Sequence, residues 1–424
     1  MGTISDKLTY TLAAVDDIRT AIREHDVEIG NDVPLGNYGD KIRGISTLEI
    51  NAPVKNVTLP FAVEKGDVIY GKEQFDSNIS PSTAPAGMGY GCSFSPDGNH
   101  LAVAHANTPY ISIYKRAGDT FTKLANPATL PVGGASNCSF SPDGNHLVVA
   151  HGASPFITIY KRNGDTFTKL ANPATLPDSD ARGCSFSPDG TYLAVACYAT
   201  TPLVIYKREE DVYSRLANPA SPSARGLSCS FSGDGTYLAV ISYYSPALAV
   251  YKRNGDTFTK VANPTLITNS FGCSFSPDGN YLAAAHNNTP YVSIYKRAGD
   301  TFTKLANPTT LPSSNASSCS FSPDGAYLAV GHTNGSGITL YLRKGDEFIK
   351  IDGPTGVYGK GNGCSFSADG ETLAVAHAGS PYIAVYNKRS IFSEHNDLSP
   401  LQFVAVALQA GDVGDVVEAN HITI

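Results

Sequence analysis

The fold is decided by one stretch of 36 residues, CSFSPDGNHLAVAHANTPYISIYKRAGDTFTKLANP, at Cys92–Pro127. It consists of four short β-rich runs, CSFS, HLAVAH, YISIYK and TFTKL, separated by residues typical of turns. In SPDG the proline fixes φ and the glycine supplies a positive φ, and RAGD closes a second tight hairpin. The stretch therefore predicts four antiparallel strands and no helix.

The same unit recurs along the chain of 424 residues. Its cysteine returns at intervals of 44 to 46 residues, and a period of roughly 40–45 residues with four strands per unit is typical of a propeller blade. The sequence therefore predicts an all-β fold, a seven-bladed β-propeller at residues 73–396. The repeated cysteines are Cys92, Cys138, Cys184, Cys229, Cys273, Cys319 and Cys364.

The words FSPDG and LAVAH…ISIYKR resemble the WD40-like and lactonase-like families of seven-bladed propellers. The resemblance implies the fold but no particular function. The chain departs from true WD40 repeats because it contains no tryptophan. Tyrosines stand in the corresponding places, at Tyr114, Tyr160, Tyr206, Tyr251, Tyr295, Tyr341 and Tyr386.

One strand is expected to close the ring. Lys72–Pro81 aligns with the end of the first full unit, so that Phe75 matches Phe121. This extra outer strand precedes the first blade and can complete the last one. Ser390–Asn396 competes with it for the same place.

Residues 1–50 predict a helical anchoring segment. An apolar stripe follows Ser5, a plausible N-cap, and Gly30 ends the helix. A short, exposed stripe of this kind favours self-association, most simply as a trimer, although the helix could instead pack on its own chain. The stripe is formed by Leu8, Leu12, Val15, Ile18 and Ile22.

The remaining flanks, residues 51–72 and 397–424, read as two parts of a small β-module into which the propeller is inserted. The strand segment FAVEKGDVIYG lies at Phe61–Gly71, and its partner occupies Leu401–Ile424. Both flanks and the N-terminal segment resemble parts of tailed-phage tail, fibre and decoration proteins. This resemblance implies a virion protein, assembled in the host cytoplasm with other virion proteins.

Charge and hydropathy narrow the partners. The net charge of −7 is spread along the chain without a basic block, which argues against nucleic acid. The longest apolar runs, such as Phe403–Leu408, are far shorter than the ~20 residues of a membrane helix, so no membrane insertion is expected. The first residues also lack the basic region of a secretory signal.

Repeated polar residues predict structure rather than chemistry. The eight cysteines, including Cys197, are expected to be buried free thiols. The SPDG aspartates are expected to serve the turns, and the KR-x-GD hairpins to carry solvated charge. No catalytic set, metal site or cofactor motif is predicted. Five histidines share the end of the second strand and favour packing between blades over ligand contact: His105, His151, His286, His332 and His377.

The copies differ mainly before each cysteine and between the second and third strands. These two regions emerge on one face, where variable loops on a rigid frame favour recognition, with neutral drift as the alternative. The distinctive residues there are aromatic and cationic types suited to sugars or acidic groups. They are Arg182, Tyr198, Arg225, Tyr243, Tyr244, Phe271, Tyr358 and Lys360.

The sequence thus favours a non-enzymatic virion protein whose propeller binds a host cell-surface glycan or envelope component. Two other classes stay open. One is a lactonase-like propeller hydrolase, and the other is a cytoplasmic WD40-like scaffold for protein partners.

Overall fold

A computed structural model describes residues 54–58, 68–220, 224–261, 264, 269–354, 357, 359–393, 403–407 and 416–423. The chain divides into two compact units, Phe75–Lys388 and a second unit made of Met1–Gln74 with Arg389–Ile424. Within the described ranges, no helix is long and apolar enough to cross a membrane. The predicted N-terminal helix, with its stripe Leu8–Ile22, lies outside these ranges and stays a prediction.

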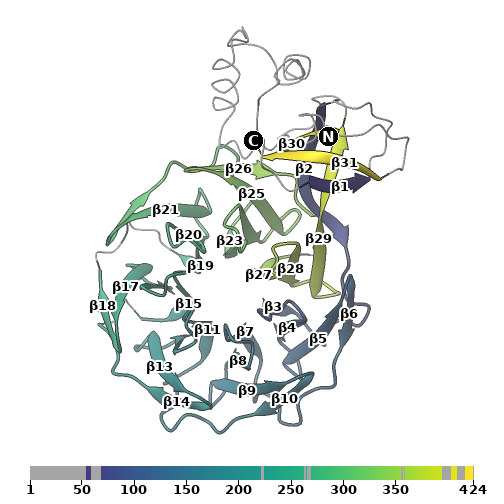
Figure 1. Cartoon of the computed structure of the whole chain (residues 1–424). Coiled ribbons are helices and arrows are strands. Elements are labelled where there is room, and N and C mark those ends of the chain that lie inside the picture. The colour runs from purple at the N-terminus through teal and green to yellow at the C-terminus, as the bar shows by residue number, and fades with distance from the viewer. Residues whose placement is uncertain are drawn as a thin grey trace, which may run out of the picture. The chain divides into compact units, whose positions relative to one another are not determined.

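The unit Phe75–Lys388 is a seven-bladed, all-β propeller, as the sequence predicts (Figure 1). The first three blades are β3 (Gly89–Phe94), β4 (His100–His105), β5 (Ile111–Ala117), β6 (Thr120–Lys123); β7 (Ala135–Phe140), β8 (His146–His151), β9 (Ile157–Asn163), β10 (Thr166–Lys169); and β11 (Ala181–Phe186), β12 (Tyr192–Cys197), β13 (Leu203–Glu209), β14 (Val212–Arg215). The next three are β15 (Gly226–Phe231), β16 (Tyr237–Ser242), β17 (Leu248–Asn254), β18 (Thr257–Lys260); β19 (Ser270–Phe275), β20 (Tyr281–His286), β21 (Val292–Ala298), β22 (Thr301–Lys304); and β23 (Ala316–Phe321), β24 (Tyr327–His332), β25 (Ile338–Lys344), β26 (Glu347–Ile351). The seventh contains β27 (Gly361–Phe366), β28 (Thr372–His377) and β29 (Ile383–Ser393).

The core lies between neighbouring blades. Ala102 and Ile113 of the first blade pack with Phe140 and Leu147 of the second, and equivalent clusters follow around the ring. The tyrosines that replace the WD tryptophan are fully buried. The Tyr114 hydroxyl donates to the Thr83 carbonyl oxygen at 2.9 Å, so this buried ring keeps a partner for its polar group.

The ring is closed by β2 (Val68–Asn78), whose later residues form the outer strand beside β29. Phe75 is fully buried, and its ring lies edge-on to Tyr327 and Phe366, with centroid distances of 5.5 Å for both. It thus takes the place that Phe121 has in the first blade, as expected. Closure by Ser390–Asn396 is wrong, because Ser390 continues β29 and the outer place is already filled.

The other unit contains a small antiparallel sheet. Its strand order is β1 (Val54–Thr58), β31 (Val416–Thr423), β30 (Phe403–Ala407) and the first residues of β2. Val68 pairs with Val406 and Gly71 with Phe403. The two flanking segments therefore join in one sheet, as the sequence suggests. The predicted domain boundaries and the likeness to phage modules stay predictions.

The SPDG turns behave as expected. The Ser95 hydroxyl donates to Asp97 Oδ1 at 2.5 Å, and the Asn99 amide donates to the same oxygen at 3.0 Å. Gly98 has a φ of 69°, which a side chain would strain. The equivalent serine–aspartate hydrogen bond occurs in every blade.

The lysine and aspartate of the KR-x-GD hairpins are solvent-exposed, as expected, but the hairpin charges also pair between blades. Arg162 of the second blade bonds Asp97 of the first at 2.5 Å, and Lys115 of the first bonds Asp165 of the second at 2.7 Å. The charges pair across blades because each hairpin lies beside the preceding SPDG turn. Burial alone would raise the pKa of Asp97, but hydrogen bonds from Arg162 and Ser95 outweigh it and hold that pKa well below its usual range.

Candidate functional site

Each innermost strand begins with a β-bulge. In β11 the pairing with β12 shifts between Ala181 and Gly183, so Arg182 is the extra residue. A bulge bends its strand and changes the direction of a side chain. The same shift occurs in all seven blades, two residues before the repeated cysteine. The seven bulge residues are Tyr90, Ser136, Arg182, Leu227, Phe271, Ser317 and Asn362.

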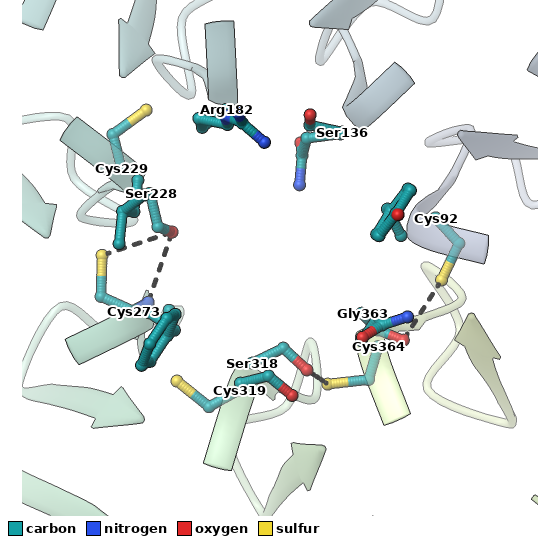
Figure 2. A pocket seen from close by; sticks show the side chains of 18 of the residues that line it. Cys92, Ser136, Arg182, Ser228, Cys229, Cys273, Ser318, Cys319, Gly363 and Cys364 are labelled. Carbon is teal, nitrogen blue, oxygen red and sulfur yellow. Dashed lines mark hydrogen bonds between the residues drawn. The ribbon is translucent and has the colours of Figure 1, made fainter. Parts of the chain in front are cut away.

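All seven bulge residues line one cavity of about 390 Å³ at the centre of the ring, here called the axial cavity. Figure 2 shows Arg182 extending toward its open centre, with five of the repeated cysteines around the circumference, Cys92, Cys229, Cys273, Cys319 and Cys364. The cysteine is the same in every blade, whereas the bulge residue is aromatic, cationic, aliphatic, hydroxyl or amide. The frame therefore repeats, but the surface of the cavity does not.

The innermost strands approach one another closely below this surface. A Cβ added at Gly183 would lie 2.9 Å from the Cα of Ser228 in the next blade. Gly363 faces Gly91 across the closure of the ring with a corresponding distance of 2.8 Å. This crowding leaves little room for a side chain beside these backbones and holds the bulge residues in fixed places.

The axial cavity has an excess of positive charge. Among the described residues that line it, Arg182 and Lys360 are charged and none is acidic. The Arg182 side chain is 41% exposed, and one of its nitrogens lies 3.1 Å from Asp180 Oδ2. Lys360 is half-buried, and burial lowers the pKa of its ammonium group.

Polar and aromatic groups complete the lining. The Asn362 amide donates to the Gly89 carbonyl at 2.7 Å, and the Ser317 hydroxyl donates to the Gly361 carbonyl at 2.6 Å. These bonds leave the amide oxygen and the hydroxyl lone pairs as acceptors. Tyr90 is 40% exposed and Phe271 is half-buried, so both offer aromatic surface to the cavity.

A second group, the rim cluster, consists of Arg182, Tyr198, Arg225, Tyr243 and Tyr244. The Arg225 guanidinium lies 4.8 Å from the centroid of the Tyr198 ring and 5.1 Å from that of Tyr244. It also donates to the Tyr198 hydroxyl at 2.8 Å. Arg182 lies 5.3 Å from the Tyr198 ring, so this side chain joins the rim cluster to the axial cavity.

The backbone of the rim cluster is held in an unusual form. Arg225 has a φ of 65°, a conformation that costs free energy for any residue with a Cβ. Its amide donates to the Ala199 carbonyl at 2.7 Å, and its carbonyl accepts from the Tyr243 amide at 2.9 Å. These bonds join loops of the third and fourth blades. They fix the backbone next to Tyr198 and at Tyr243.

The distinctive residues chosen from the sequence fall into these two groups. Arg182, Phe271 and Lys360 line the axial cavity, and Arg182 also belongs to the rim cluster with Tyr198, Arg225, Tyr243 and Tyr244. Tyr358 lies outside the described residues. The sequence analysis missed the other bulge residues, Tyr90, Ser136, Leu227, Ser317 and Asn362. Their signal was the variation at one position, two residues before the cysteine.

The repeated histidines are structural, as predicted. His105 is fully buried, and its Nε2 lies 3.0 Å from the Ser112 hydroxyl. Burial, with a smaller contribution from Lys123, lowers the pKa of His105 to about 4. Within the part of the chain that is described, no group of His, Cys, Asp and Glu side chains could hold a metal ion.

The thiols are free, as predicted, and all but Cys364 are buried. Cys138 lies 3.6 Å from the Ala102 carbonyl of the preceding blade, and burial raises the pKa of its thiol to about 12. At neutral pH such a thiol is protonated and a poor nucleophile. The burial of Cys138 therefore fits the predicted role of the repeated cysteines as small packing residues.

Comparisons with known proteins give the fold and no more. No protein-family model and no curated protein sequence matches the chain. Many solved structures resemble it, among them the hydrazine synthase of Kuenenia stuttgartiensis at 17% identity. That likeness has a TM-score of 0.58 and covers 73% of this chain and 97% of the other. It is a likeness of propeller architecture.

Proposed function

We propose that this protein is a non-enzymatic recognition protein of a tailed-phage virion, whose propeller binds a glycan or envelope component on the host surface. The rim cluster is the observation that carries the proposal. It places three tyrosines and two arginines side by side on a frame that otherwise repeats. Aromatic faces and guanidinium groups are the usual means of binding sugar rings and their polar substituents.

The geometry of the rim cluster suits a surface ligand. Tyr243 is 38% and Tyr244 46% exposed, and the two rings meet edge-on at 5.3 Å. Their order is set by neighbours in the same cluster, which lowers the entropy cost of binding. The strained φ of Arg225 supports the same reading, because such strain is common at ligand sites.

The proposed place on a virion rests on the flanking segments. The sheet formed by β1, β31, β30 and the start of β2 provides a unit separate from the propeller. Self-association through Leu8–Ile22, if it forms a trimer, would present three rim clusters at once. Multivalency would then raise the avidity of individually weak sites.

The test is adsorption to host cells of particles that carry variants of the full chain. Tyr198→Ala with Tyr244→Ala should lower adsorption at least tenfold while incorporation into particles is unchanged, because the aromatic contacts are lost and the scaffold is not. The control is Val212→Ala, which shortens an exposed apolar side chain on the outer strand β14, outside the rim cluster. Adsorption equal to that of the parent particle would overturn the proposal.

A further inference from the structure

We infer that the axial cavity binds an acidic group, a carboxylate or sulfate, carried by a ligand the size of one sugar. This inference rests on the proposed function and deepens it, because Arg182 belongs to both the cavity and the rim cluster. It names the chemical class of the ligand that the propeller recognises.

The first step is the sign of the charge. Arg182 and Lys360 line the cavity, and none of its described lining residues is acidic. The nearby Asp180 contacts a single nitrogen of Arg182 and is itself about one-third exposed. A guanidinium has five N–H donors, so most of them stay available to an anion. A cationic ligand is disfavoured by the same two charges.

The second step is the state of Lys360. The residue is half-buried, and within the described part of the chain burial alone, with no neighbouring carboxylate, shifts the pKa of its ammonium group. A partly desolvated charge without a partner is unfavourable, and an incoming anion would relieve that cost. The hydrogen bond from Ala378 to the Lys360 carbonyl, at 2.9 Å, fixes the backbone from which the side chain extends.

The third step is the position of the two cations. Arg182 lies on β11 of the third blade, and Lys360 immediately precedes β27 of the seventh. In a ring of seven these blades lie on opposite sides of the axis, and both residues line the cavity, so the two charges come from different sides of it. An anion between them can interact with both, each at the strength of a charge-assisted hydrogen bond.

The fourth step is size and remaining chemistry. A cavity of about 390 Å³ lies at the small end of the range for small-molecule sites. Tyr90 and Phe271 supply aromatic faces, and Asn362 supplies an amide oxygen. Together these groups fit the ring and hydroxyls of a sugar whose acidic substituent lies between the cations.

The experiment is calorimetric titration of the full chain with glucuronate, glucose 6-sulfate, inorganic sulfate and, as the neutral match, glucose. At least one sugar acid should bind tenfold or more tightly than glucose. Lys360→Gln and Arg182→Gln should each lower that affinity about tenfold, because each removes the charge from one hydrogen bond to the anion. Lys350→Gln, which removes an exposed charge on β26, should leave it unchanged.

Three results would overturn the inference: equal affinity for glucose and both sugar acids, unchanged affinity in Lys360→Gln, or an equal loss in Lys350→Gln. If inorganic sulfate binds as tightly as glucose 6-sulfate, the result supports an anion-binding site in the cavity and shows that the sugar ring adds no affinity. Tyr244→Ala separates the two proposals, because it should impair adsorption without changing binding of these small acids. Loss of adsorption without acid binding would leave the proposed function standing and remove this inference.

Discussion

The two ends of each blade are built from the same strands but differ in what constrains their residues. At the end with the SPDG turns, Asp97 bonds Arg162 and Lys115 bonds Asp165, and similar pairs recur between later blades. At the opposite end, here called the axial end, the innermost strand begins with the bulge. There the bulge residue faces the axial cavity and does not have to bond a particular side chain of the next blade. The lysine and arginine that form these pairs recur in most blades, whereas the bulge residue, which faces open space, differs from blade to blade.

An exception at the uniform end supports this contrast. The sixth blade has Leu342 where the first has Lys115. The partner would be the hairpin aspartate of the seventh blade, but that blade takes its outer strand from β2 and has no such hairpin. Leu342 instead packs in the same cluster as Phe75. The lysine is therefore retained only where its partner exists.

The largest expected effect is on the closure of the scaffold. Phe75→Ala should lower the free energy of unfolding by about 3–5 kcal/mol, because it empties a fully buried site between Tyr327 and Phe366. Urea denaturation of the full chain measures the change. Phe121→Ala is the matched variant. Phe121 is 4% exposed and has the equivalent place in the first blade, whose outer strand is joined to its neighbour by a hairpin. A loss below about 1 kcal/mol for Phe75→Ala would show that β2 does not hold the ring closed.

The next effect is the pH dependence of stability, which the buried histidines at the ends of the second strands of the blades should produce. Burial lowers the pKa values of His105, His151 and His286 to about 4, below the 6.5 of an exposed histidine. Between these values the unfolded chain binds more protons than the folded one, so stability falls as the pH decreases from about 6.5 to 4. Each histidine should contribute about 1.4 kcal/mol per pH unit.

The third blade offers a matched replacement, because it has Cys197 and Val204 where the first has His105 and Ser112. The double variant His105→Cys with Ser112→Val should reduce the slope of stability against pH by the contribution of one histidine. Denaturation at several pH values between 7 and 4 measures that slope. An unchanged slope would mean that His105 is not held neutral by burial.

The smallest effect tests the uniform end alone. Arg162→Gln should lower the free energy of unfolding by about 1 kcal/mol, since Asp97 is 37% exposed and solvent weakens the pair. Arg116→Gln is the control, because Arg116 lies 3.6 Å from Asp369 and should contribute less. Neither change should alter ligand binding at the axial end. A binding defect in Arg162→Gln would contradict the view that the SPDG end contributes stability and the axial end binds the ligand.

The sequence predicted the ring because its signals are local. The spacing of the cysteines, the turn residues and the match of Phe75 to Phe121 each follow from short-range chemistry. The ion pairs between blades were missed because Lys115 and Asp119 are close in sequence, whereas the actual partner of Lys115 is Asp165 of the next blade. Only part of the axial cavity was predicted. The bulge at Arg182 depends on how two strands pair, and composition does not reveal that pairing.

The place of Phe75 has a consequence for how the protein is made. This residue leaves the ribosome before the first blade, yet it packs against Phe366, about 290 residues later in the chain. At a synthesis rate of about 5–20 residues per second, the strands that pack against β2 are made on the order of 15–60 s after it. An incomplete chain cannot close its ring. Prematurely terminated copies would therefore expose an unpaired edge and be open to proteolysis, so closure acts as a check that synthesis has reached the last blade.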